Sequence, residues 1–208
     1  MVVQYLQTSS NPNHTIISLH GWTGNVKSMQ QVAKAFNFID TYWIFPQAPY
    51  SASPGGFSWF EGDKKKGWDY NPSIRIIDKL VDEQLKNGFT HNNIFLLGFS
   101  QGASLVLEYM VGKRLLIAGG ISIAGFIRDK KRFNDPNLDT CKNGRLLLIH
   151  GKNDQIIFPS ESKKAYKIFT KLGYQVDLKI LNSRHKVPMD AKPLIEKFLS
   201  PDLILKQT

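Results

Sequence analysis

The chain has 208 residues, of which 42% are hydrophobic and 21% charged, a globular composition that excludes disorder as its main state. The first residues show no basic, apolar leader pattern, and no run approaches the roughly 18 apolar residues of a membrane span. We therefore expect a single cytoplasmic domain covering residues 1–208.

The basic excess does not by itself identify a partner. Lys and Arg number 27 against 17 Asp and Glu, a net charge of +10 that favours anionic partners. The basic residues are spread along the chain, and the two short runs at 64–66 and 130–132 lie in predicted loops. A solvated surface therefore explains them better than nucleic-acid binding, for which no motif is found. Peripheral contact with anionic lipid stays open, and the oligomeric state is not predicted.

The only cysteine is Cys141. One cysteine forms no internal disulfide and gives no cluster of metal ligands. We expect neither a metal nor a cofactor.

The first half of the chain predicts strands that alternate with helices. Short apolar segments predict strands, and apolar residues at helical spacing predict helices, the second of which begins at Asn71 and is stopped by Gly88. The expected elements are strands over 2–6, 15–19 and 42–45, helices over 26–36 and 71–87, and a long loop over 50–70.

The second half continues this alternation. The expected elements are strands over 94–97, 115–118, 121–123, 146–149 and 176–180, a helix over 160–172, a loop over 125–144 and a final helix that includes 194–199. After Ser100 we expect an amphipathic helix with Ala103, Val106, Leu107 and Met110 on one face. Such alternation predicts an α/β fold with a mainly parallel central sheet flanked by helices. The loop over 125–144 is too short for a cap domain.

The segment Gly98-Phe99-Ser100-Gln101-Gly102 has the GxSxG pattern of a nucleophile elbow. A buried apolar strand leads into it and a helical pattern leads out, so the chain must reverse within very few residues. Only small residues fit two positions either side of such a turn. Ser100 is therefore our candidate nucleophile.

Asp154 and His185 follow the ends of two later strands, and such ends gather at one edge of a parallel sheet. A serine needs a base to take its proton, and a carboxylate orients that base. The order Ser, Asp, His is typical of α/β hydrolases. The alternatives are a turn aspartate and a surface histidine, and Asp129, Asp135 and Asp139 compete weakly as the acid.

Two backbone N–H groups are candidates for an oxyanion hole. The segment from His20 to Asn25 joins a strand to a helix, which places the N–H of Trp22 near that of Gln101 in a hydrolase of this layout. The alternative is an ordinary strand-to-helix turn.

The long loop over 50–70 is rich in aromatic residues, among them Trp59 and Phe60. Aromatic side chains outside a periodic element line an apolar substrate pocket or anchor the loop to the core. We name Trp59 and Phe60 as pocket candidates.

Several motifs together resemble the phospholipase/carboxylesterase family, which includes the acyl-protein thioesterases. They run in order along nearly the whole chain: His20-Gly21, Phe45-Pro46-Gln47-Ala48-Pro49, Ser58-Trp59-Phe60, Gly98 to Ala103, and His150-Gly151-Lys152-Asn153-Asp154. The resemblance implies a capless α/β hydrolase that cleaves carboxylic esters or thioesters through an acyl-enzyme, lysophospholipids included. It carries the triad onto Ser100, Asp154 and His185, and the oxyanion donors onto Trp22 and Gln101.

The chain departs from the family's pattern at two positions. Arg184 replaces the usual glycine before the histidine, and Trp22 replaces a small or aliphatic residue. Arg184 is a third pocket candidate, which with Lys186 would favour anionic substrates. Hydrolysis of an amide or lactone, and a non-catalytic fold used for binding, are the alternative functions.

Overall fold

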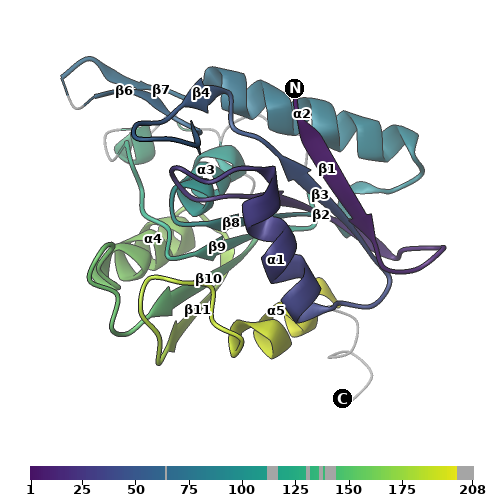
Figure 1. Cartoon of the computed structure of the whole chain (residues 1–208). Coiled ribbons are helices and arrows are strands. Elements are labelled where there is room, and N and C mark those ends of the chain that lie inside the picture. The colour runs from purple at the N-terminus through teal and green to yellow at the C-terminus, as the bar shows by residue number, and fades with distance from the viewer. Residues whose placement is uncertain (64, 112–116, 130–131, 136–137, 139–143, 201–208) are drawn as a thin grey trace, which may run out of the picture.

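A seven-stranded sheet forms the centre of the molecule (Figure 1). The computed structural model describes residues 1–63, 65–111, 117–129, 132–135, 138 and 144–200. In sheet order the strands are β1 (Val3–Gln7), β3 (Thr41–Pro46), β2 (His14–Leu19), β8 (Ile94–Phe99), β9 (Gly119–Ile123), β10 (Arg145–Gly151) and β11 (Gln175–Leu181). Only β1, at one edge, pairs antiparallel, so the predicted, mainly parallel sheet is confirmed.

Helices cover both faces of this sheet. One buried cluster joins it to α2 (Asn71–Lys86), α3 (Gln101–Met110) and α4 (Ser160–Lys171), and a second joins it to α1 (Val26–Phe36) and α5 (Ala191–Leu199). Short 3₁₀ turns lie at His91–Asn93 and Arg132–Asn134. Among the described residues no separate cap domain covers the sheet, and none of the helices is both long and apolar enough to cross a membrane.

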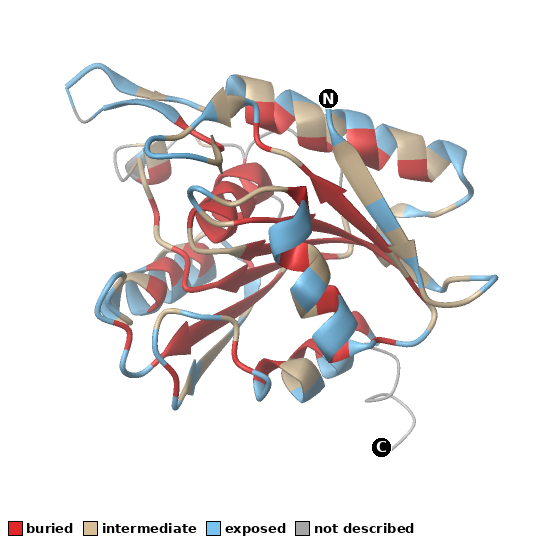
Figure 2. Ribbon diagram, in the orientation of Figure 1, coloured by how far each residue is buried: buried red, intermediate tan, exposed pale blue. Residues whose placement is uncertain are grey.

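The helix that follows Ser100 differs from the expected amphipathic helix. All 10 residues of α3 are buried, and Figure 2 shows it red along its length. Its polar side is covered as well: the Glu108 carboxylate accepts hydrogen bonds from Tyr70 and Arg132. The reason is that α2 and the loop before it pack over the face that the pattern predicted to be solvated.

Two other segments differ from the expectation. The predicted strand over 115–118 lies partly outside the described residues, and its last two, Ile117 and Ala118, precede β9. The predicted loop over 50–70 contains two small hairpins, β4 (Tyr50–Ser51) with β5 (Phe57–Ser58) and β6 (Glu61–Asp63) with β7 (Gly67–Asp69). Strands of two or three residues are too short for alternation to predict.

Candidate active site

Ser100 lies in the sharp turn between β8 and α3. Its backbone has φ 53° and ψ −111°, a strained conformation for a residue with a side chain. The N–H of Ser100 donates to the carbonyl of Ile123 at 2.8 Å, which ties the turn to the end of β9. The hydroxyl is thus presented at the positive N-terminal end of a buried helix.

Glycines on both sides make this turn feasible. A Cβ at Gly98 would lie 2.4 Å from the backbone of Gly102, and a Cβ at Gly102 would lie 2.4 Å from the carbonyl oxygen of Leu19. Strand β8, helix α3 and strand β2 therefore approach one another more closely than any side chain allows.

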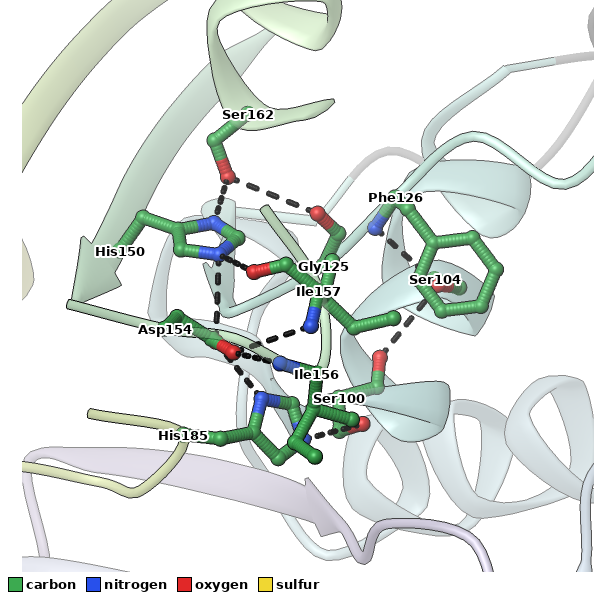
Figure 3. Close-up of polar contacts among 10 residues, drawn as sticks. All are labelled: Ser100, Ser104, Gly125, Phe126, His150, Asp154, Ile156, Ile157, Ser162 and His185. Carbon is green, nitrogen blue, oxygen red and sulfur yellow. Dashed lines mark hydrogen bonds and ion pairs between the residues drawn. The ribbon is translucent and has the colours of Figure 1, made fainter. Parts of the chain in front are cut away.

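The structure brings Ser100, His185 and Asp154 into one chain of hydrogen bonds (Figure 3). The His185 Nε2 atom lies 3.0 Å from Ser100 Oγ, and His185 Nδ1 lies 2.7 Å from Asp154 Oδ2. The ring of His185 also packs on Phe99, with 5.0 Å between ring centres. The three residues follow β8, β10 and β11, so they meet at the carboxyl edge of the sheet.

Asp154 is almost completely buried and is held as a carboxylate. Burial alone would raise its pKa, but hydrogen bonds from His185 and from the N–H groups of Ile157 and Ile156 outweigh it and lower the pKa below the ordinary range. The two backbone donors contact Oδ1, so Oδ2 faces His185.

A second buried histidine, His150, lies behind this carboxylate; it belongs to one of the sequence motifs named above, but the sequence predicted no role for it. The His150 Nε2 atom lies 2.8 Å from the carbonyl oxygen of Ile157 and 3.3 Å from Asp154 Oδ2. Its Nδ1 lies 2.6 Å from Ser162 Oγ in α4. With Nε2–H as donor, the Ser162 hydroxyl donates to Nδ1, and the ring supports Asp154 from the side opposite His185.

The loop after β2 is held from three sides. The N–H of Ala48 donates to His20 Nε2 at 3.2 Å, so the other ring nitrogen, Nδ1, carries the hydrogen and donates to the Gly21 carbonyl at 2.7 Å. The indole N–H of Trp59 donates to the His20 carbonyl at 2.8 Å. Burial lowers the pKa of His20 to about 4, so its ring is neutral at pH 7.

These contacts leave two N–H groups available beside the serine. Within the described part of the chain, neither the N–H of Trp22 nor that of Gln101 has a hydrogen-bond partner. Both residues line the same cavity as Ser100. The Gln101 side chain accepts a hydrogen bond from the backbone N–H of Trp59 and donates one to Ser58 Oγ, each at 2.9 Å.

A cavity of about 520 Å³ opens beside Ser100. Its walls come from the 50–70 loop, the segment after β9 and the segment after Asp154. The larger side chains that line it are Trp22, Tyr50, Phe60, Trp68, Phe126, Arg128, Ile156 and Ile157.

Of the three pocket candidates, only Phe60 lines this cavity. Trp59 is completely buried, because its ring packs on His20 and its N–H groups bond to His20 and Gln101. Arg184 lines a separate hollow with Asn153 and Lys186. The sequence also missed Phe126 and Arg128, since their segment has no periodic pattern.

The described part of the chain holds no group of three His, Cys, Asp or Glu side chains arranged to bind a metal ion. Asp139 and Cys141, weighed above from the sequence, lie outside the described residues.

Comparison with known proteins then decides the family. The model of the phospholipase/carboxylesterase family matches residues 4–201, nearly the whole chain. The chain belongs to the phospholipase/carboxylesterase family. The protein is accordingly a serine hydrolase of the esterase and thioesterase type.

Relatives and solved structures agree with this family. Acyl-protein thioesterase 1 of Kluyveromyces lactis is 27% identical over 202 residues, which cover 89% of this chain and 87% of that protein. The crystal structure of esterase PE8 superposes with a TM-score of 0.80 at 23% identity, covering 95% of this chain and 97% of that one. The structure of SOBER1 from Arabidopsis thaliana gives 0.77 at 20% identity, covering 91% and 99%. The fold is thus the α/β-hydrolase fold.

Proposed function

We propose that the protein hydrolyses carboxylic esters or thioesters by a Ser-His-Asp acyl-enzyme mechanism. The observation that carries the proposal is the unbroken chain of hydrogen bonds from Ser100 through His185 to Asp154. A serine hydroxyl placed 3.0 Å from an imidazole nitrogen, itself held by a buried carboxylate, is an activated nucleophile.

In this mechanism Ser100 Oγ attacks the acyl carbon while His185 Nε2 takes the hydroxyl proton. Asp154 accepts the Nδ1–H bond, which fixes the tautomer and stabilises the imidazolium. His185 then protonates the leaving alcohol or thiol. Water attacks the acyl-enzyme with His185 as base, and the proton returns to Ser100 as the carboxylic acid departs.

The N–H groups of Trp22 and Gln101 are the proposed donors to the oxyanion of each tetrahedral intermediate. Their support is that they line the cavity at Ser100 and have no partner in the described protein. Donors held in advance by folded backbone need no reorganisation as the negative charge develops. His20 positions the Trp22 loop through its two ring hydrogen bonds.

The test is covalent labelling with a fluorophosphonate probe, together with hydrolysis of p-nitrophenyl esters and matched thioesters. We expect the wild-type protein to be labelled and the Ser100→Ala variant not to be. Ser51→Ala is the control, because Ser51 is an exposed serine in the wall of the same cavity. It should keep its label.

Labelling of Ser100→Ala, or full ester turnover by it, would refute the proposal. The ratio of kcat/KM for an ester and a thioester of one acyl group then assigns the preferred bond.

A further inference from the structure

Arg128 lies in the wall of the cavity beside Ser100, five residues after the end of β9. Its guanidinium carbon lies 4.1 Å from the ring centre of Trp68, 4.8 Å from that of Phe60 and 5.0 Å from that of Phe126. All three rings line the same cavity. The cation is therefore held by aromatic faces.

Arg128 has no anionic partner of its own among the residues that the structure describes. Its Nε atom is buried without a hydrogen-bond partner. The carboxylate whose charge acts on Arg128 belongs to Glu108, and that group is hydrogen-bonded to Arg132 and Tyr70. Burial lowers the pKa of Arg128, although a guanidinium stays cationic at neutral pH.

A partly buried cation without a counterion is a ready site for an anion. The planar guanidinium binds a carboxylate or phosphate through two parallel hydrogen bonds, and the aromatic rings restrict its position. Among the described residues that line the cavity, the one carboxylate is that of Glu61, which is exposed, so water and salt screen its charge.

We propose that Arg128 is a specificity residue that binds an anionic group of the substrate, a carboxylate or phosphate, while the ester lies at Ser100. This proposal rests on the proposed function, since it names the substrate class of that same site. It also moves the recognition of anions, which the sequence suggested for Arg184 and Lys186, to a residue inside the cavity.

The first experiment compares two substrates that differ in one charge. These are p-nitrophenyl hydrogen adipate, whose acyl chain ends in a carboxylate, and p-nitrophenyl adipamate, whose chain ends in a neutral amide. In Arg128→Gln we expect the ratio of kcat/KM for the acid over the amide to fall roughly 10- to 100-fold, the loss of a charge-assisted hydrogen bond. An Arg128 that only supports the fold would affect both substrates alike, so an unchanged ratio rules out a carboxylate bound on the acyl side.

Arg184→Gln is the matched control. It also removes one positive charge, next to His185 but outside the cavity. Screened by solvent, that charge should alter the ratio by less than about twofold. An equal fall of the ratio in both variants would mean that the general positive field selects the substrate, and would overturn the assignment to Arg128.

A second pair of substrates distinguishes the source of the anion. These are 1-butyrylglycerol 3-phosphate and 1-butyrylglycerol, whose released acid is titrated. Dependence on Arg128 in the adipate pair alone places a carboxylate on the acyl side. Dependence in the glycerol pair alone places a phosphate on the alcohol side. No dependence in either pair overturns the proposal.

Binding separates this proposal from the catalytic one. The 4-nitroanilides of adipic acid, one ending in the acid and one in the amide, are titrated calorimetrically into Ser100→Ala and Ser100→Ala/Arg128→Gln. We expect the acid to bind roughly 10-fold more tightly only where Arg128 is present. Equal affinities rule out a carboxylate on the acyl side, and together with no dependence on Arg128 in the glycerol pair they overturn the Arg128 proposal. A Ser100→Ala protein that still hydrolyses esters refutes the catalytic proposal instead. If Arg128→Gln does not fold, Arg128→Lys, which keeps the charge but loses the planar pair of donors, replaces it and should still lower the ratio.

Discussion

At the scale of single residues, the site depends on Asp154, although this residue reaches Ser100 only through His185. This carboxylate accepts bonds from two backbone N–H groups on Oδ1 and from His185 on Oδ2, with His150 behind it. Every one of these donors favours the charged form. Asp154 is thus fixed in position and in charge before any substrate binds.

We expect Asp154→Asn to lower kcat by about 10³- to 10⁴-fold, because an amide places the wrong tautomer of His185 against Ser100. Steady-state hydrolysis of a p-nitrophenyl ester measures the change, with thermal unfolding to show that the variant folds. Asp177→Asn removes an exposed carboxylate from β11 and serves as the control. A loss below about 10-fold in a folded Asp154→Asn would contradict the role given to this residue.

The sequence could predict some of these residues because their positions follow from the strand pattern. Ser100, Asp154 and His185 each come shortly after the end of a predicted strand, and parallel strands end at one edge. Arg128 follows a strand too, but its proposed role depends on three aromatic rings, two of which, Phe60 and Trp68, come from a distant segment. Trp59 shows the opposite case, since composition cannot tell an aromatic side chain in a cavity wall from one in the core.

At the scale of elements, the site depends on how closely β2, β8 and α3 pack. We expect Gly102→Ala to lower the free energy of unfolding by about 3 kcal/mol or more, because its Cβ would lie 2.4 Å from the Leu19 carbonyl oxygen, a backbone atom that cannot move alone. Urea unfolding measures this loss.

Gly55→Ala is the comparison for this prediction. A Cβ at Gly55 would meet nothing within 4 Å, so its effect should stay within about 0.5 kcal/mol. Similar stability of the two variants would mean that the turn relaxes and that the close approach is not required.

Gln101 links the start of α3 to the loop that forms the cavity wall. Its side chain bonds to the Trp59 N–H and to Ser58, and all three residues are buried. We expect Gln101→Met to lower the free energy of unfolding by about 1–3 kcal/mol, because the buried backbone N–H of Trp59 loses its acceptor. Urea unfolding checks this, with Gln31→Met on the exposed side of α1 as control. Equal stabilities would contradict the link.

The sequence predicted the long helices and strands, but it did not predict features that depend on contacts between distant segments. Alternation and helical spacing are local signals, so the strands of the large sheet and helices α1 to α5 could be predicted from them. The complete burial of α3 depends on α2 and the 50–70 loop packing over it. The spacing of residues within α3 does not indicate that these two segments cover the helix.

At the scale of the whole molecule, buried histidines link the fold to pH. His20 joins the end of β2 to the segment after β3, through Ala48, and to the loop of Trp22. Its pKa is lowered to about 4, chiefly by burial and against the hydrogen bond to Gly21. Burial also lowers the pKa of His14 at the start of β2.

The direction in which pH changes the stability follows from the pH at which the folded and the unfolded state each bind a proton. An unfolded histidine binds a proton below about pH 6.5, whereas folded His20 does so only near pH 4. The unfolded state therefore binds more protons in this window, and the free energy of unfolding falls as the pH is lowered from about 6.5 to 4, by about 3 kcal/mol for His20. The pKa of Asp154 is lowered in the folded protein, so this residue stabilises the fold above about pH 3.9, the pKa of an unfolded aspartate. That stabilisation is lost as the pH falls below about 3.9.

Urea unfolding of the wild type and of His20→Asn at intervals from pH 7.5 to 4 isolates this contribution. The variant should be less stable at pH 7, because the Ala48 N–H and the loop of Trp22 lose their partner. Its stability should fall less steeply between pH 6.5 and 4, since asparagine does not titrate. The growing positive charge of the protein acts on both proteins equally, so the difference between the two curves belongs to His20. Parallel curves over that window would show that His20 has the same pKa in the folded and unfolded states, which would contradict the lowered pKa of His20 in the folded protein.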